Sequence, residues 1–145
     1  MVKSPPQGMP ACCPYLLYDD IDAAAEFLAK AFGFEKRFAH AGPDGKTAHA
    51  QLAEGSAVIM LAGTHAPGAL RRGRSPKDAG SLNASVYMYV ADADAHFRRA
   101  RTAGAEILAE PTDTPWGDRI YCAVDPEGQL WCFATHTREV AMSGA

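Results

Sequence analysis

Two stretches of the chain follow the same order of residue types, and this internal repeat constrains the fold more than any other feature. The first covers residues 15–33 and the second residues 86–104. Each opens with aromatic and β-branched residues that favour a strand, reaches an aspartate that can accept the N–H groups of a helix start, and closes at a glycine suited to a helix end. We therefore predict a strand and a helix in each stretch, with N-caps at Asp20 and Asp92 and helix ends at Gly33 and Gly104.

Three antiparallel strands are predicted after each helix. In the first half they cover residues 36–41, 47–53 and 57–62, separated by Pro43–Gly45 and Glu54-Gly55 turns. In the second half they cover residues 105–109, 119–124 and 130–135, with a proline-containing loop after the first and an Asp125-Pro-Glu-Gly128 turn before the last. Both halves read βαβββ, so the predicted class is α+β.

The length and composition suit one globular domain. The chain has 145 residues, of which 48% are apolar and 21% charged, as in proteins that fold around a single core. We expect a flexible N-terminal tail (1–10), one domain (11–137) and a C-terminal tail (138–145). The domain divides into module one (11–63), a connector loop rich in Gly, Pro and Arg (64–82) and module two (83–137).

Charge and hydropathy exclude several classes of partner. A formal net charge of −3 gives no attraction for a polyanion, so no nucleic-acid partner is expected. No apolar run approaches the roughly 20 residues of a membrane helix, and the first ten residues lack a hydrophobic signal core. We therefore expect a cytoplasmic location and no membrane partner. The cysteines form no CxxC pair and are expected to be free, mostly buried thiols, at Cys12, Cys13, Cys122 and Cys132.

Several phrases accompany the repeat in a specific order. Trp116-Gly-Asp-Arg and Asp125-Pro-Glu-Gly-Gln-Leu-Trp131, set around two βαβββ halves, resemble the vicinal oxygen chelate superfamily of glyoxalases, bleomycin-resistance proteins and extradiol dioxygenases. The phrases His49-Ala-Gln-Leu, Val58-Ile-Met-Leu and Trp131-Cys-Phe-Ala-Thr-His136 look most like its PhnB-like branch. The resemblance, from about Cys12 to His136, implies an eight-stranded, incompletely closed sheet with helices on the outer face, a ligand cavity on the concave face, and a homodimer.

Side-chain alternation along the strands assigns residues to the cavity face. Val86, Met88 and Val90 should pack against a helix, so their neighbours should face the cavity. Trp116 follows Pro115 in a loop, where an indole can stack on a flat ligand. The residues expected to bind the ligand are Tyr15, Leu17, Val58, Met60, Ser85, Tyr87, Tyr89, Trp116 and Cys132.

Metal-dependent members of the superfamily place one His, Gln or Glu ligand on the first and fourth strand of each half. Those places fall on Cys13 (or Pro14), Met60, Ser85 and Cys132. Divalent ions that act as Lewis acids need imidazole or charged oxygen donors, so we expect no metal and no other cofactor. The sharper alternative is a soft Cu(I) site built from two thiols and a thioether, although buried Cys and Met more often fill cores.

Two histidines and one thiol could take part in chemistry. His49 and His136 lie in the family-like phrases and could act as general bases. No partner acid or nucleophile is evident, so the sequence favours a hydrogen-bonded or solvent-facing imidazole at each position. Cys132 could be a nucleophile only if a base, a cation or a helix N-terminus activated it. We therefore assign no catalytic residue.

The basic residues are open to more than one interpretation. Arg119 could bind an anionic group or pair with a carboxylate such as Asp125. The cluster Arg71–Arg74, with Lys77, could clamp an anionic ligand, cover the cavity, or form a solvated loop.

These patterns together predict a metal-independent binding protein of the bleomycin-resistance kind, which holds a small aromatic or apolar compound between its two modules. Three alternatives stay open. They are a metal-dependent lyase or dioxygenase whose ligands lie elsewhere, an isomerase built on His49 or His136, and a partner-binding module with an empty cavity.

Overall fold

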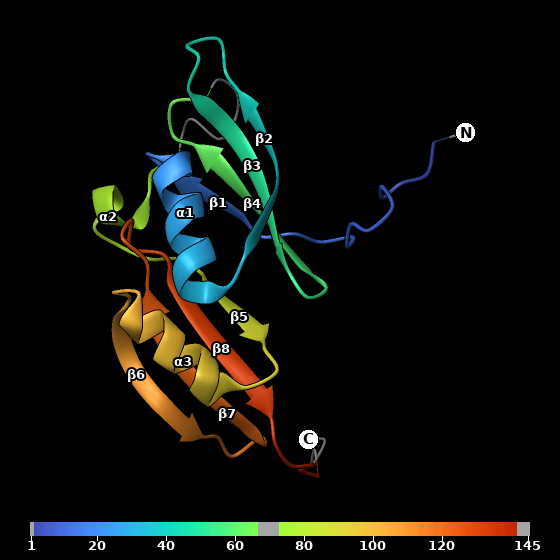
Figure 1. Ribbon diagram of the computed structural model, residues 1–145, viewed down its shortest axis with the longest axis vertical. Helices are drawn as coiled ribbons and strands as arrows, with labels where there is room; N and C mark the ends of the chain where they lie inside the picture. The colour runs from blue at the N-terminus through green and yellow to red at the C-terminus, as the bar shows by residue number, and fades with distance from the viewer. Residues whose placement is uncertain (1, 67–72, 142–145) are drawn as a thin grey trace.

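The computed structural model describes residues 2–66 and 73–141 and contains two βαβββ modules, one above the other in Figure 1. Module one consists of β1 (Tyr15–Tyr18), α1 (Ile21–Phe32), β2 (Glu35–Ala41), β3 (Thr47–Glu54) and β4 (Ala57–Gly63). Module two consists of β5 (Ser85–Tyr89), α3 (Ala93–Thr102), β6 (Glu106–Asp113), β7 (Asp118–Val124) and β8 (Leu130–His136), and α2 (Pro76–Ala79) lies in the connector. The predicted α+β class and the two βαβββ modules are confirmed. None of the helices in the described residues is long and apolar enough to cross a membrane.

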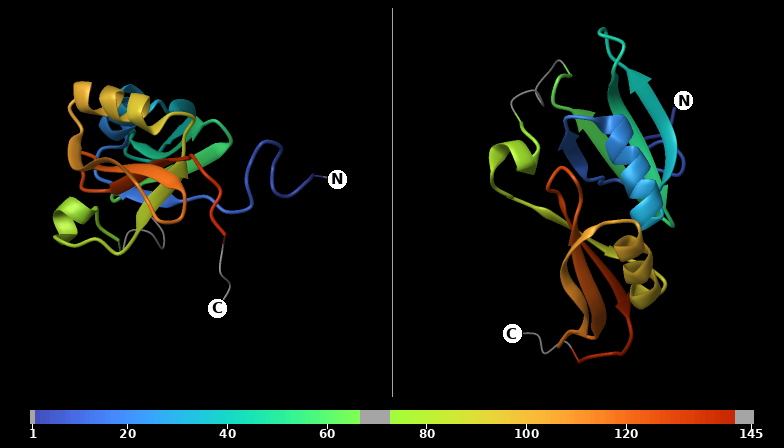
Figure 2. Two further views of the ribbon diagram at one scale, coloured as in Figure 1. Left: turned by 90° about the horizontal axis from the view of Figure 1, so that it is seen from below. Right: turned by 60° about the vertical axis from the view of Figure 1, so that its left-hand side comes forward.

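The eight strands form two separate four-stranded sheets. Their orders are β1-β4-β3-β2 and β5-β8-β7-β6, and in each sheet the first strand pairs in parallel with the fourth while the other pairs are antiparallel. In the described residues no ladder joins the two sheets. Helices α1 and α3 lie on the same side of the molecule (Figure 2, left). The opposite face of each sheet, called here the open face, is left without a helix.

Both long helices begin and end where the repeat predicts. The carboxylates of Asp20 and Asp92 each accept a hydrogen bond, of 3.0 Å, from the backbone N–H three residues later. Gly33 has a φ of 82° and Gly104 a φ of 93°, the left-handed conformation that glycine adopts without a Cβ penalty. The local signals in the sequence therefore fix these two helices.

Strand β6 is longer than predicted. The sequence placed Pro111 in a loop after a strand ending at Ala109, but β6 continues to Asp113. A proline is tolerated there because β6 is an edge strand, on which one N–H needs no ladder partner. The register of β6 against β7 shifts on both sides of Ala109.

The two modules share one hydrophobic core. The ring of Phe32, at the end of α1, lies 5.7 Å from the ring of Trp131 and 4.8 Å from that of Phe133, both on β8. Met88 on β5 and Leu52 on β3 belong to the same buried cluster. Burial of these rings between α1, α3 and the sheets therefore holds the modules together.

The Asp125–Trp131 phrase makes the polar connection between modules. The buried carboxylate of Asp125 accepts hydrogen bonds from the Tyr18 hydroxyl at 2.6 Å and from Trp131 Nε1 at 3.1 Å. The Glu127 carboxylate accepts the backbone N–H groups of Asp19 at 2.6 Å and Asp20 at 3.0 Å. These bonds attach the β7–β8 turn to the start of α1 and explain why this turn carries two acidic residues.

The expectation of four free, mostly buried thiols is wrong. Cys122 and Cys132 lie opposite each other on β7 and β8 with their Cα atoms 4.3 Å apart, and they form a disulfide. This spacing belongs to the close, non-hydrogen-bonded pairs of an antiparallel ladder, which bring two facing side chains together. Cys12 and Cys13 are free, but Cys12 is exposed and Cys13 only half-buried.

Candidate ligand-binding site

A hollow of about 890 Å³ lies between β1 of module one and β5 of module two, at the edges of the two sheets. This volume falls in the range of roughly 300–1,000 Å³ that is typical of small-molecule pockets. Part of the wall between the strands comes from the connector, namely Gly73, Arg74, Pro76, Ala79, Ser81, Leu82, Asn83 and Ala84. Four of the predicted ligand-binding residues line the hollow, namely Tyr15, Leu17, Ser85 and Tyr87.

A second group of predicted residues surrounds Asp118, the first residue of β7. The buried carboxylate of Asp118 accepts hydrogen bonds from the hydroxyls of Tyr87 at 2.6 Å and Tyr89 at 2.9 Å, and it contacts His136 Nδ1 at 2.8 Å. Trp116 Nε1 donates to the Tyr87 hydroxyl at 3.3 Å. We call these five residues the Asp118 cluster. Because Tyr87 belongs to both groups, the cluster adjoins the hollow.

Hydrogen bonding sets the charges in the Asp118 cluster. Donation from Tyr87, and then from His136, lowers the pKa of Asp118 to about 2. The same contact with Asp118 raises the pKa of His136, because the carboxylate favours the imidazolium form. The pKa of Tyr87 is raised first by burial and then by its bond to Asp118. At neutral pH the carboxylate is therefore ionised and the phenols remain neutral donors.

Gly117 fixes the loop that carries Trp116. It has a φ of 95°, and a Cβ at this position would collide with the carbonyl oxygen of Arg138. The Gly117 carbonyl accepts the N–H of Thr137 at 2.9 Å. The Trp116-Gly-Asp-Arg phrase is therefore the point at which the segment after β8 packs against the β6–β7 loop.

The other predicted ligand-binding residues lie outside the hollow. Val58 and Met60 are on the open face of β4, and Met60 is the register partner of Tyr15. Cys132 is the register partner of Tyr87, and its sulfur is bonded to Cys122. The predicted division of β5 agrees with the structure, since Met88 is in the core and its neighbours Tyr87 and Tyr89 are on the open face.

Sequence reasoning did not identify Asp118. The residue is the register partner of His136 across β7 and β8, so alternation along both strands places the two side chains on the open face. The aspartate of the Trp116-Gly-Asp-Arg phrase could therefore have been predicted as a site residue from the sequence.

His49 contacts one residue of the hollow, since its Nδ1 is 3.0 Å from the Tyr15 hydroxyl. Burial lowers the pKa of His49, and the neighbouring His40 lowers it further. His49 is therefore a neutral partner that orients Tyr15.

The basic residues divide between structural pairs and the hollow. Arg119 contacts both carboxylate oxygens of Asp94, at 2.7 and 3.1 Å, and not Asp125. Lys77 lies 3.9 Å from Asp19. Arg74 lines the hollow, whereas residues 71 and 72 of the basic cluster lie outside the described residues.

Comparison with known proteins decides the family. The model of the Glyoxalase/Bleomycin resistance protein/Dioxygenase superfamily matches residues 11–133. The chain belongs to this superfamily. This glyoxalase-superfamily protein is 35% identical over 133 residues to the uncharacterized protein Mb0911c of Mycobacterium bovis, covering 92% of this chain and 88% of that one.

Solved structures also resemble this glyoxalase-superfamily protein. The match with TioX from Micromonospora sp. ML1 covers 84% of the present chain and 94% of the TioX chain, with 34% identity and a TM-score of 0.69. The match with UcmS2 covers 87% of the present chain and 98% of the UcmS2 chain, with a TM-score of 0.66. Because the identity is 19%, it supports the fold alone.

The positions that metal-dependent superfamily members use do not provide donors for a divalent ion here. The sulfur of Cys132 is in a disulfide, so these positions offer the Met60 thioether, the Ser85 hydroxyl and the single free thiol of Cys13. Divalent ions that act as Lewis acids prefer several imidazole and carboxylate donors. In residues 2–66 and 73–141 there is no group of three His, Cys, Asp or Glu side chains that could hold a metal ion. The Cu(I) alternative needs two thiols, and one of them, Cys132, is oxidised in the disulfide.

Proposed function

We propose that this glyoxalase-superfamily protein binds a small aromatic or apolar compound, without a metal, in the hollow between β1 and β5. The supporting observation is the pair of tyrosines that line the hollow from different modules. Tyr15 and Tyr87 are 44% and 43% exposed, so each has ring surface that a ligand can cover. Burial of apolar surface contributes roughly 25 cal/mol per Å² before the costs of association.

The site is organised before a ligand arrives. Asp118 and Trp116 hold the Tyr87 hydroxyl, and His49 holds that of Tyr15. Side chains that are already fixed lose little rotamer entropy on binding, which leaves more of the contact energy for affinity. The hydroxyl of Ser85 lies in the same wall and can orient a polar group of the ligand.

We also propose that the protein works as a homodimer, as is expected of the PhnB-like branch that its phrases favour. Aromatic side chains on the open faces are exposed, with values of 50% for Phe38, 61% for Tyr89 and 53% for Trp116. Monomers rarely leave large contiguous apolar patches in water. A second chain across the open faces would cover these rings and deepen the hollow.

The binding proposal is tested with a neutral fluorescent probe, N-phenyl-1-naphthylamine, titrated into the full chain. Tyr15→Ala and Tyr87→Ala should each weaken binding by about tenfold or more, because burying one large side chain is worth about 1.5–3 kcal/mol. Leu108→Ala is the control: this apolar residue of β6 is 56% exposed and does not line the hollow. Chelation with EDTA should change nothing.

Two results would contradict the proposal. One is unchanged probe affinity in both tyrosine variants, which would place any binding elsewhere. The other is loss of binding on chelation and recovery with a divalent metal, which would favour the metal-dependent alternative.

A further inference from the structure

We infer that the compound bound in the hollow is an anionic aromatic one, an aryl carboxylate, and that Arg74 binds its carboxylate. This inference rests on the proposed function and adds the charge of the ligand to it. The juxtaposition that carries it is one guanidinium and two tyrosine rings, Tyr15 and Tyr87, in the wall of the same hollow.

The described side chains that line the hollow carry charge of one sign. Among the described residues that line it, Arg74 is the one with a charged side chain, and no aspartate or glutamate is present. The polar side chains of the wall are neutral, among them Asn83, Ser85 and Gln129. The ionised Asp118 behind Tyr87 is engaged by two tyrosine hydroxyls and by His136, so Arg74 is the charge in the wall that a ligand would meet. A guanidinium there attracts anions.

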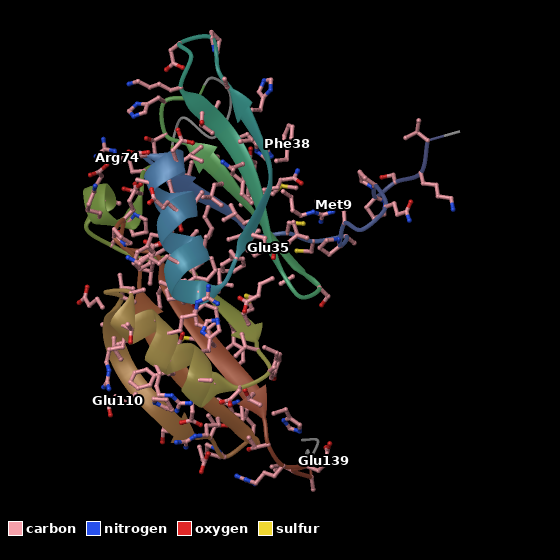
Figure 3. All side chains as sticks on the ribbon, viewed as in Figure 1. Met9, Glu35, Phe38, Arg74, Glu110 and Glu139 are labelled. Atoms are coloured by element: carbon pink, nitrogen blue, oxygen red, sulfur yellow. A yellow bond between two sulfur atoms is a disulfide. The ribbon has the colours of Figure 1, made fainter. Side chains whose placement is uncertain are left out.

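Arg74 differs from Lys77 and Arg119 in having no carboxylate partner among the described residues. Lys77 lies within 3.9 Å of Asp19, and Arg119 is held by Asp94 and Asp113. In residues 2–66 and 73–141 no carboxylate lies within ion-pair distance of Arg74. It is an exposed residue next to α2, at the edge of the molecule in Figure 3. Its guanidinium can therefore give both N–H groups of its fork to a ligand.

The chemistry of these groups selects the ligand class. A guanidinium binds a carboxylate through two parallel hydrogen bonds, and the exposed tyrosine rings favour a flat aromatic body. A neutral aromatic would leave Arg74 without a partner, and an organic cation would be repelled by it. An aryl carboxylate satisfies both parts of the wall.

The experiment compares two probes of the same size, 2-naphthoate and 2-naphthamide, by displacement of N-phenyl-1-naphthylamine from the full chain. The wild type should bind the carboxylate about tenfold more tightly than the amide, the lower end of what hydrogen bonds to charged groups contribute. Arg74→Gln should abolish this preference and leave the affinity for the amide unchanged, and Arg74→Lys should retain part of it. Lys77→Gln, which alters a cation that does not line the hollow, should keep the full preference.

The outcomes separate the two proposals. If both probes bind equally to the wild type, or if Arg74→Gln keeps the preference, the inference about charge is wrong while binding of aromatics stands. If neither probe binds, the proposed function fails and the inference fails with it. Higher salt should reduce the preference in the wild type and have no effect in Arg74→Gln.

Discussion

Reduction of the Cys122–Cys132 disulfide should lower the free energy of unfolding by a calculable amount. The two cysteines are 10 residues apart in the chain, and the chain-entropy relation for a loop of that length gives about 2.7 kcal/mol. The folded state should keep its hairpin, because the β7–β8 ladder from Asp118 to Val124 does not depend on the bridge. The stabilisation therefore acts on the unfolded chain. For a protein of this size the expected fall in melting temperature is about 5–11 °C.

The assay is urea unfolding followed by circular dichroism, with and without dithiothreitol. The wild type and a Cys12→Ser/Cys13→Ser control should both lose about 2.7 kcal/mol on reduction. A Cys122→Ser/Cys132→Ser variant should already be destabilised and should not respond to the reductant. Ellman's reagent gives an independent check, since the unreduced native chain should expose only the thiols of Cys12 and Cys13.

Two results would refute this reasoning. Reaction of four thiols in the unreduced, denatured protein would show that the bridge does not form in solution. Equal stability of the control with and without reductant would show that the bridge forms without restricting the unfolded chain.

Three further predictions concern the loops and the Asp118 cluster. Gly117→Ala should cost about 1–3 kcal/mol in urea unfolding through its steric clash, and more than Gly45→Ala, where φ is also positive but no atom lies within 4 Å. Asp118 has a pKa of about 2, below its usual 3.8, so its stabilisation is present above pH 3.8 and is lost as the pH falls towards 2. The pKa of His136 is raised above 6.5, so its contribution to the free energy of unfolding is complete below pH 6.5 and is lost as the pH rises through the raised value. Asp118→Asn should flatten the pH–stability curve in both the acidic and the neutral range. Glu127→Gln, which weakens two bonds to the start of α1, should destabilise the protein by about 1.5–3 kcal/mol in the same unfolding assay.

The helices could be predicted from the sequence because their signals are local. The aspartates at 20 and 92 and the glycines at 33 and 104 act within one turn of the residues they terminate. The predicted strand ended at Ala109, before the observed end of β6, because a proline usually interrupts the hydrogen bonds between strands. Whether the strand lies at an edge depends on the order of the whole sheet, which no local pattern contains.

The length of the turn between β7 and β8 decides whether the two cysteines face each other. A four-residue turn at 125–128 would place Cys122 opposite Trp131. The four-residue turn does form, since the Gly128 N–H donates to the Asp125 carbonyl at 3.0 Å, but the N–H of Asp125 bonds to the carbonyl of Gln129, also at 3.0 Å, so that Gly128, with a φ of 88°, adds one residue to the connection. Five residues in the turn place Cys122 opposite Cys132. The reducing compartment assumed for the chain argued against a bridge, but register decides which side chains meet.

The phrases by which the superfamily is recognised have structural roles in this chain. The Asp125–Trp131 phrase binds one module to the other through Asp125 and Glu127, and the Trp116-Gly-Asp-Arg phrase packs its loop against the end of the chain through Gly117. The first phrase also contributes Gln129 and Leu130 to the wall of the hollow, whereas the side chains that give the wall aromatic surface and positive charge, Tyr15, Tyr87 and Arg74, belong to neither phrase. The phrases that identify the superfamily therefore hold the modules in place and form part of the wall, while the aromatic and charged groups proposed to select the ligand lie outside them. Substitution of Tyr15 or Arg74 should change which compound binds without changing the fold.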